Sequence, residues 1–223
     1  MADDFGAAKA FRIPVIMGVF MALIFFVPAG SLSFAAGWGY WAVTTGFLIF
    51  FTIYFLRKDP ALLARRNQVK EREPQAAGLR LLSILWALGF LIPGFDYRYH
   101  WSSVPTWLAI LSLILVAVGY LIIFSVFRAN TFASTIVQVE QEQRVITTGP
   151  YAWVRHPMYS GLILTSLFTP FALGSYWAFL TFILIIPTLV YRIKGEEKLL
   201  LSDLPGYEEF CTKTRHRLIP LVW

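Results

Sequence analysis

The stretch PTWLAILSLILVAVGYLIIFSVF, residues 105–127, carries no charged side chain and is long enough to cross a bilayer as a single helix. Hydrophobic residues make up 57% of the chain and charged residues 14%, against about 25% charged in ordinary soluble domains. Five further apolar stretches are predicted to cross the membrane: residues 11–29, 38–56, 79–95, 159–173 and 175–193. The sequence therefore predicts an all-α integral membrane protein with about six transmembrane helices.

The last two stretches are separated only by Gly174, which predicts a tight helical hairpin. The first arm is short and contains Pro170, and the second contains Pro187. Proline removes a backbone donor inside a helix and leaves a carbonyl without its usual partner. We therefore expect both arms to be kinked.

The basic residues predict the orientation of the chain. When six helices are drawn through a membrane, every lysine and arginine except Arg98 falls on one side. The positive-inside rule makes that side cytoplasmic, which gives a multi-pass protein with both termini in the cytoplasm. The net charge of +6 is then an orientation signal with attraction to membrane lipids, and no nucleic-acid partner is expected. A cleaved signal peptide in place of the first helix is the alternative, and it would put the termini on opposite sides.

The loop between the second and third predicted helices and the single cysteine give two further predictions. The loop of residues 57–78 is rich in basic side chains with a few apolar ones between them, so we interpret it as an interfacial segment that contacts lipid headgroups. Cys211 is the single cysteine, so one chain can form neither a disulfide framework nor a thiolate metal site. We expect no metal.

The stretch TTGPYAWVRHPMYSG, residues 147–161, places ionisable and aromatic groups at the start of the fifth predicted helix. Residues 134–139 alternate in a way that favours an extended segment, and residues 147–150 favour a turn. Proline suits the first position of a helix and disfavours helical backbone in the residue before it, so a helix should begin at Pro157. Arg155 and His156 would then lie beside free N–H groups, where an anion can bind.

A second cluster follows the last predicted helix and contains Glu196 and Glu197. Neighbouring positions on a helix point about 100° apart, so the two carboxylates cannot face the same direction. We expect one to point toward a ligand and the other toward water or a lysine. An ordinary charge pattern at a helix end is the alternative interpretation.

Together these residues resemble the isoprenylcysteine carboxyl methyltransferases, a family of integral-membrane enzymes with the phospholipid methyltransferases as a neighbouring branch. The family pattern G-x-Y-x-x-x-R-H-P-x-Y-x-G is filled at every fixed position, by Gly149, Tyr151, Arg155, His156, Pro157, Tyr159 and Gly161. A hairpin and the pattern E-E-x-x-L should follow, and the chain supplies Glu196, Glu197 and Leu200. The family-like tail contains Tyr207, Phe210 and residues 217–220. The resemblance covers residues 130–223, and the residues before it carry no diagnostic pattern.

The resemblance implies that S-adenosyl-L-methionine is the cofactor and that it binds in a cytoplasm-facing pocket. It assigns ten residues to that pocket: Gly149, Pro150, Tyr151, His156, Pro157, Tyr159, Gly161, Glu196, Glu197 and Leu200. His156 suits the carboxylate of the cofactor, and one of the two glutamates suits its ammonium group or its ribose. Tyr151, Trp153 and Tyr159 could face the sulfonium.

Arg155 and Glu197 are the expected catalytic residues. Arg155 would orient an acceptor carboxylate, and Lys213 and Arg217 are the other expected substrate-binding cations. Because the tail run of residues 212–217 departs from the family's pattern, the position of the orienting cation stays open. The expected reaction is an in-line methyl transfer at about 3–3.5 Å, which for a carboxylate acceptor needs no general base.

The predicted function is therefore methyl transfer to a lipophilic small-molecule or lipidated acceptor, most simply carboxyl O-methylation of an isoprenylcysteine-like or other lipid acid. Residues 1–127 would supply four transmembrane helices, and residues 128–223 the methyltransferase region with the hairpin and a cytoplasmic tail. Three alternatives remain. The acceptor could be a phospholipid or another lipid amine, the protein could be a non-enzymatic scaffold or transporter subunit, or it could be a sterol reductase that uses a dinucleotide.

Overall fold

The computed structural model describes residues 7–67, 73–130, 144–220 and 222–223. Within these ranges the chain is helical and contains no strand. The main helices are α1 (Ala7–Ala29), α2 (Ala35–Lys58), α3 (Pro60–Asn67), α4 (Glu73–Tyr99), α5 (Thr106–Ala129), α6 (Pro157–Ala172), α7 (Ala178–Ile183), α8 (Ile185–Asp203) and α9 (Tyr207–Lys213). A 3-10 turn, η1 (Gly149–Ala152), precedes α6. The expected extended segment at residues 134–139 lies outside the described residues.

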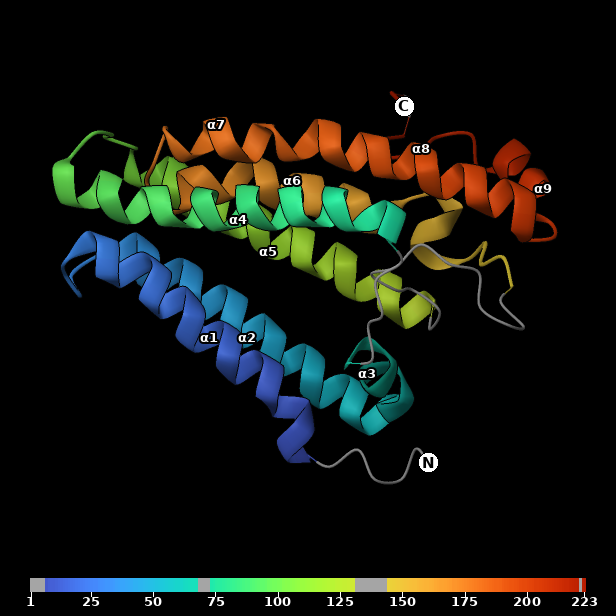
Figure 1. Ribbon diagram of the computed structural model, residues 1–223, viewed down its shortest axis with the longest axis horizontal. Coiled ribbons are helices and arrows are strands. Elements are labelled where there is room, and N and C mark those ends of the chain that lie inside the picture. The colour runs from blue at the N-terminus through green and yellow to red at the C-terminus, as the bar shows by residue number, and fades with distance from the viewer. Residues whose placement is uncertain (1–6, 68–72, 131–143, 221) are drawn as a thin grey trace.

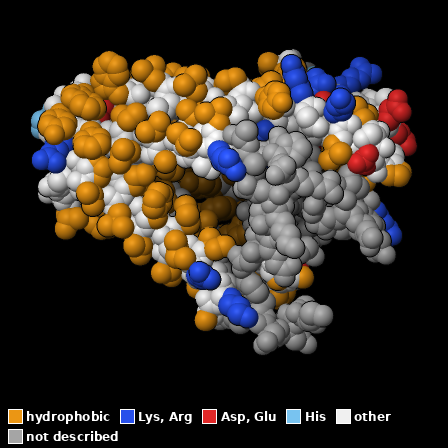
Figure 2. Space-filling model, viewed as in Figure 1, with side chains coloured by type: hydrophobic (Ala, Val, Ile, Leu, Met, Phe, Trp, Pro, Cys, Tyr) orange, Lys and Arg blue, Asp and Glu red, His pale blue; other side chains and the backbone are white. Residues whose placement is uncertain are grey.

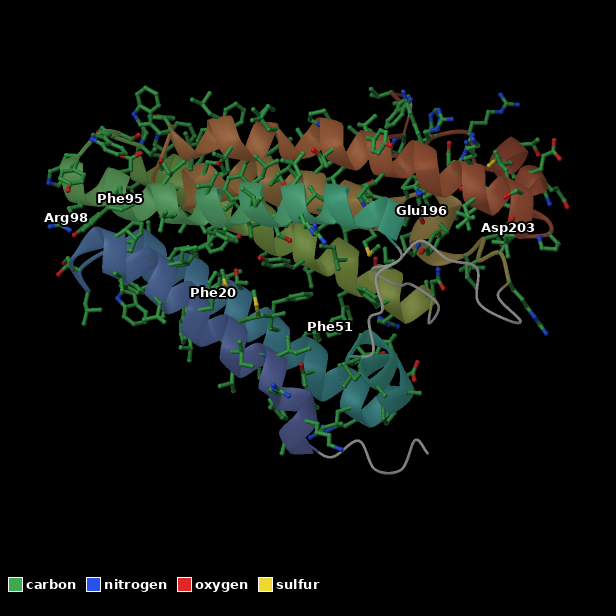
Figure 3. The ribbon with its side chains drawn as sticks, viewed as in Figure 1. Phe20, Phe51, Phe95, Arg98, Glu196 and Asp203 are labelled. Atoms are coloured by element: carbon green, nitrogen blue, oxygen red, sulfur yellow. The ribbon has the colours of Figure 1, made fainter. Side chains whose placement is uncertain are left out.

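The long helices run side by side, so that the molecule has two ends (Figure 1). At one end, called the turn end, the chain reverses between α1 and α2, between α4 and α5, and between α6 and α7. At the other, called the tail end, lie α3, η1 and α9. Figure 3 places Arg98 at the turn end, and Glu196 and Asp203 toward the tail end. Arg98, the one basic residue that the sequence puts on the other side of the membrane, is thus far from the predicted site.

Five helical segments are long and apolar enough to cross a membrane by length and composition: Ala8–Ala29, Ala35–Lys58, Arg80–Tyr99, Thr106–Ala129 and Ala178–Asp203. The prediction of six spans is therefore not confirmed. The missing one is α6, which has 16 residues and so is about 24 Å long, less than the hydrocarbon thickness of about 30 Å. The structure is nevertheless that of a multi-pass membrane protein.

The predicted helical hairpin of residues 159–173 and 175–193 differs from the structure in its connection and in its second arm. The connection between α6 and α7 includes Leu173–Trp177 rather than Gly174 alone, and Gly174 has a φ of +74° that suits glycine. The second arm is interrupted at Leu184 between α7 and α8. The interruption begins just after Ile183, whose carbonyl would accept from residue 187 in an unbroken helix. Because Pro187 has no N–H to donate to that carbonyl, the helix is interrupted at the position expected from Pro187.

The loop predicted over residues 57–78 is largely helical. It contains α3, where Leu62 is 1% exposed and its backbone N–H is capped by the Asp59 carboxylate at 3.0 Å. It also contains the start of α4, which begins at Glu73 rather than at residue 79. The helix extends past its apolar part because residues 73–78 include good helix formers such as glutamine and alanine.

Helices α5 and α6 cross closely because each has a glycine at the contact. A Cβ atom at Gly161 would lie 2.8 Å from the carbonyl oxygen of Gly119, and one at Gly119 would lie 2.6 Å from a methyl group of Thr165. Small residues of this kind let membrane helices approach one another. This crossing holds α6 against α5 just after its first turn, where the predicted site begins.

A buried carboxylate holds two connections together at the turn end. Asp96 is 1% exposed, and its carboxylate accepts from the N–H of Ser102 at 2.7 Å and from the Ser102 hydroxyl at 2.6 Å. It also accepts from the hydroxyl of Ser175, which precedes α7. Asp96 therefore joins the α4–α5 connection to the α6–α7 connection.

Helices α1 and α2 approach α4 at the turn end and diverge from it toward the tail end (Figure 1). Near the turn end the ring of Phe25 contacts Tyr40 and Phe90. Farther toward the tail end, α2 contacts α5 through Phe51 and Phe124. Figure 2 shows the resulting hollow on this face of the molecule, with hydrophobic side chains around it.

Candidate functional site

The segment that precedes α6 has the backbone conformation that the sequence predicts. Gly149 opens η1 with a φ of +62°, and Pro150 follows it. His156 has φ −124° and ψ 60°, which is not helical, and α6 begins at Pro157. His156 makes no side-chain cap to the first turn of α6. The N–H groups of that turn are therefore not satisfied by a capping side chain, as an anion-binding helix end requires.

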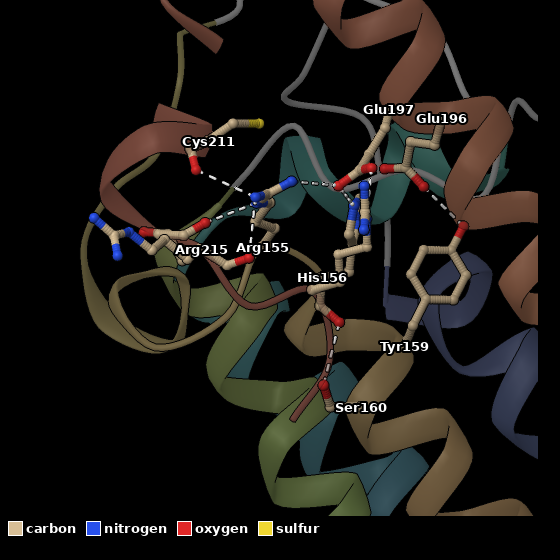
Figure 4. Close-up of polar contacts among 10 residues, drawn as sticks. Arg155, His156, Tyr159, Ser160, Glu196, Glu197, Cys211 and Arg215 are labelled. Carbon is tan, nitrogen blue, oxygen red and sulfur yellow. Dashed lines mark hydrogen bonds and ion pairs between the residues drawn. The ribbon is translucent and has the colours of Figure 1, made fainter. Parts of the chain in front are cut away.

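Glu197 is the centre of the candidate site (Figure 4). It lies on α8 and is 6% exposed. Its Oε1 atom lies 3.1 Å from Nη1 of Arg155 and 3.3 Å from Nε2 of His156. Its Oε2 atom accepts from Nε of Arg217 at 2.7 Å. One buried carboxylate thus joins the R-H-P motif to the tail, with basic groups that offset its desolvation.

Arg155 is held by backbone carbonyls as well as by Glu197. Its Nε group donates to the carbonyl of Thr214 at 2.7 Å. Its Nη2 group donates to the carbonyls of Cys211 at 3.2 Å and Arg215 at 3.0 Å. The planar guanidinium uses its fixed set of donors to connect α8, the end of α9 and the following residues.

The tail also binds the backbone of the R-H-P motif. The N–H of Arg155 donates to the carbonyl of His216 at 2.9 Å, and the N–H of His156 donates to the carbonyl of Arg217 at 2.9 Å. The hydroxyl of Ser160 donates to the carbonyl of Leu218 at 2.6 Å. Residues 216–218 therefore lie against the start of α6.

Glu196 also faces α6, on the side of Tyr159. The Tyr159 hydroxyl donates to Oε2 of Glu196 at 2.8 Å (Figure 4). The Tyr159 ring lies edge-on to the His156 ring, with 5.8 Å between centroids. We expected one glutamate to point toward water or a lysine, but Glu196 meets a tyrosine instead. Both carboxylates of α8 therefore lie near α6. They point in different directions, and each meets a different residue at the start of α6: Glu197 meets His156, and Glu196 meets Tyr159.

Several predicted cofactor residues have other contacts. The Tyr151 hydroxyl accepts from Nδ2 of Asn130 at 3.0 Å, and burial raises the pKa of Tyr151 to about 12. Gly161 lies at the crossing with α5, so its lack of a side chain serves helix packing. Leu200 packs beside Leu204 and Tyr207 of the tail region. Trp153, which was expected to be able to face a sulfonium, is 72% exposed.

The two tail cations named from the sequence lie in different environments. Lys213 is on the surface, where it pairs with Glu209 at 2.7 Å with its side chain 69% exposed. Arg217 binds Glu197, and its side chain is 34% exposed. The structure thus brings Arg217 into the cluster and leaves Lys213 in an exposed pair on α9.

Sequence reasoning missed the carbonyl groups of residues 211, 214 and 215 and the side chain of Trp223. The guanidinium carbon of Arg217 lies 5.3 Å from the centroid of the Trp223 ring. Every residue has a carbonyl, so no sequence pattern could mark the three that accept from Arg155. Among the described residues no cluster of histidine, cysteine and carboxylate side chains could hold a metal ion.

Comparison with known protein families gives one result. Residues 108–202 match the model of the isoprenylcysteine carboxyl methyltransferase (ICMT) family. This range includes the R-H-P motif, Glu196 and Glu197, and it ends before the tail. No curated protein matches the chain. The family resemblance seen in the sequence is confirmed, although the match begins at residue 108 rather than at residue 130 and does not include the tail, and it supports a membrane methyltransferase.

Proposed function

We propose, from the family match and the cluster around Glu197, that the protein transfers a methyl group from S-adenosyl-L-methionine to a lipophilic acceptor at the cytoplasmic face of the membrane. Carboxyl O-methylation of an isoprenylcysteine-like or other lipid acid is the favoured reaction. The observation that carries the proposal is the contact of one buried carboxylate with the R-H-P motif and the tail cation together.

The residues at the site fit the chemical groups of the cofactor. When bound, the cofactor supplies an electrophilic methyl group on a sulfonium. The uncapped first turn of α6 and His156 would hold its carboxylate, and Glu196 or Glu197 would hold its ammonium group or ribose. Tyr159, which is buried and held by Glu196, would contact the sulfonium through its ring.

The balance of charge favours an anionic acceptor. Arg155 and Arg217 meet the carboxylate of Glu197, and Glu196 and Arg192 both interact with Tyr159, so these five charged groups keep one positive charge even when His156 is neutral. Among the described contacts Arg217 donates to Glu197 through Nε, which leaves its two Nη groups to face a ligand. A cationic amine would be repelled in this partly buried site.

The three predicted acceptor-binding cations therefore receive different parts in the proposal. Arg217 orients the acceptor carboxylate, because its guanidinium is half-buried and keeps donors for a ligand. Arg155 holds Glu197 and the tail in place, and Lys213 attracts anions from the surface of α9. Because a carboxylate is already ionised, the chain has only to place its oxygen in line with the methyl group.

The apolar surface of the protein suits a lipophilic acceptor. Helices α1 and α2 diverge from α4 toward the tail end, and the described side chains beside the hollow on this face are largely hydrophobic (Figure 2). An acyl or isoprenoid chain could enter there from the membrane. A phospholipid or other lipid amine is the alternative acceptor. An amine needs a base to remove its proton, and Glu196 is the candidate, because the Tyr159 hydroxyl binds only one of its two carboxylate oxygens.

The test has two measurements. Calorimetric titration of the detergent-solubilised protein should show binding of S-adenosylmethionine and S-adenosylhomocysteine and none of NADPH. Membranes that contain the protein are then labelled with cofactor carrying a radioactive methyl group, and the lipid extract is treated with mild alkali. A carboxyl ester releases the label as methanol, whereas an N-methyl group retains it.

Each other outcome identifies a different function. Label that depends on the protein and survives alkali would identify an N-methyltransferase. Binding of NADPH without either sulfur ligand would support a reductase, and binding of none of the three would support a non-enzymatic membrane protein.

A further inference from the structure

The side chain of Trp223 lies beside the proposed acceptor cation, although its residue lies outside the part of the chain that matches the family. The centroid of its ring is 5.3 Å from the guanidinium carbon of Arg217. An arginine over a tryptophan face gains a cation–π attraction, and the planar guanidinium stacks well on such a ring. The contact is therefore suited to fix the direction of one cation.

The ring itself is held in place from two directions. It packs against an apolar cluster that includes Tyr159 of α6, Ile193 of α8 and Leu218 of the tail. The carbonyl of Trp223 accepts from the N–H groups of Leu218 at 2.8 Å and Ile219 at 3.1 Å. These bonds return the chain toward residue 217, so that the ring stands beside the arginine that precedes the turn.

Arg217 is thereby constrained on three sides. Its own carbonyl accepts from the N–H of His156, its Nε group donates to Glu197, and its guanidinium lies over Trp223. A free arginine side chain has many rotamers, and holding it in one of them before a ligand arrives reduces the entropy lost on binding. The two Nη groups then point in a fixed direction.

We propose that Trp223 is a positioning residue, which holds the guanidinium of Arg217 against Glu197 so that its Nη groups meet the carboxylate of the acceptor. This inference rests on the proposed function, because it assigns Arg217 to an anionic acceptor. It assigns Trp223 no contact with the cofactor, so a change at Trp223 should affect the acceptor and not the cofactor.

The test uses N-acetyl-S-farnesylcysteine as a carboxylate probe and S-adenosylhomocysteine as the cofactor probe. The variants are Trp223→Leu, Trp223→Phe, Arg217→Lys and the double variant Trp223→Leu with Arg217→Lys. The matched control is Trp177→Leu, which changes a tryptophan that is 54% exposed at the turn end. Each protein is measured for kcat and KM with the carboxylate probe, for the Kd of S-adenosylhomocysteine, and for Tm.

Trp223→Leu should raise KM for the carboxylate probe about tenfold, the range expected for loss of a cation–π contact. The Kd of S-adenosylhomocysteine should stay within about twofold, and Trp223→Phe should recover most of the loss because it keeps an aromatic face. In the Arg217→Lys background the same change should cost less than about threefold, because the contact it removes is already weakened.

Two results would overturn the inference. One is an equal loss from Trp223→Leu in both backgrounds, since a residue that acts through Arg217 cannot be independent of it. The other is a parallel loss of probe affinity, cofactor affinity and Tm, which would show a general role in holding the tail. If the wild-type protein binds S-adenosylhomocysteine but no carboxylate probe, the proposed acceptor is wrong. The Tm values of the four variants then still decide whether Trp223 and Arg217 are coupled.

Discussion

The Nε group of Arg155 donates to the backbone carbonyl of Thr214 at 2.7 Å, across a separation of 59 positions in the sequence. This bond is one of three that the guanidinium makes to carbonyls in residues 211–215. The arginine of the R-H-P motif is thus fixed to the tail and to Glu197 at the same time. Its position predicts that a lysine cannot replace it.

Arg155→Lys should therefore disrupt the site although it keeps the charge. A lysine ammonium can reach one or two of the four acceptors, and each lost hydrogen bond costs about 0.5–1.5 kcal/mol. We expect methyl transfer to fall by about two orders of magnitude, with weaker binding of S-adenosylhomocysteine. Turnover and calorimetric titration measure the two effects. Arg215→Lys is the control, because the exposed Arg215 contributes only its backbone carbonyl. Equal behaviour of the two variants would remove Arg155 from the mechanism.

Glu197→Gln should weaken cofactor binding and lower stability. The change leaves Arg155 and Arg217 without their common anion in a buried position, and breaking such a pair costs about 3–5 kcal/mol. Thermal unfolding and the Kd of S-adenosylhomocysteine report both losses. Glu209→Gln breaks an exposed pair with Lys213 and should change neither measurement noticeably. Unchanged cofactor affinity in Glu197→Gln would contradict the proposed role of this carboxylate.

Gly161→Ala tests whether this glycine serves packing or ligand binding. The added Cβ would lie 2.8 Å from the carbonyl of Gly119, so α5 and α6 must separate, at a cost of about 1–3 kcal/mol. We expect a lower Tm. Gly46→Ala is the control, because a Cβ there meets nothing within 4 Å and alanine favours the helix. A normal Tm with reduced cofactor affinity would instead place Gly161 at the ligand.

Asp96→Asn should lower stability without changing the acceptor or cofactor affinity. The amide replaces an acceptor of the Ser102 and Ser175 hydroxyls by a donor, which leaves buried polar groups unsatisfied at about 1–3 kcal/mol. The two measurements are the thermal unfolding of the variant and its KM values for the acceptor and for the cofactor in methyl transfer. Asp203→Asn changes an exposed carboxylate and serves as the comparison. A changed KM would connect the turn end to the site and contradict the separation of the two.

The orientation in the membrane can be tested with single cysteines in a Cys211→Ser background. An impermeant maleimide should label Leu32→Cys, at the turn end, in intact cells. It should label Lys198→Cys only after permeabilisation, because the positive-inside rule puts the basic end in the cytoplasm. The reverse pattern would exclude a cytoplasmic site for the cofactor.

The sequence predicted those features that depend on local chemistry. Pro157 begins α6 because proline suits that position, and the second arm breaks before Pro187 because proline cannot donate. Helices α1, α2 and α5 lie within about four residues of their predicted bounds, whereas α4 begins at Glu73 rather than at residue 79 and α8 ends at Asp203 rather than at residue 193. The charge pattern also separated Arg98 from the other basic residues, and the structure puts it at the turn end.

Features that depend on distant contacts could not be predicted. The sequence gives no sign that Gly161 faces Gly119, since its motif suggests a ligand equally well. The short length of α6 was visible in the sequence, since the apolar run covers only residues 159–173, and counting it as a sixth spanning helix was the step that the structure does not confirm. The arrangement of Arg155 depends on carbonyls of the tail, which become acceptors only through the path of the chain.

That path has a consequence for how the protein is made. Arg155 emerges from the ribosome 59 positions before Thr214, whose carbonyl receives it, an interval of about 3–12 s at about 5–20 residues per second. During this interval α6, α7 and α8 can enter the membrane while Arg155 is still hydrated at its surface. Because Arg217 is part of the cluster around Glu197, the site stays incomplete until residue 217 has left the ribosome.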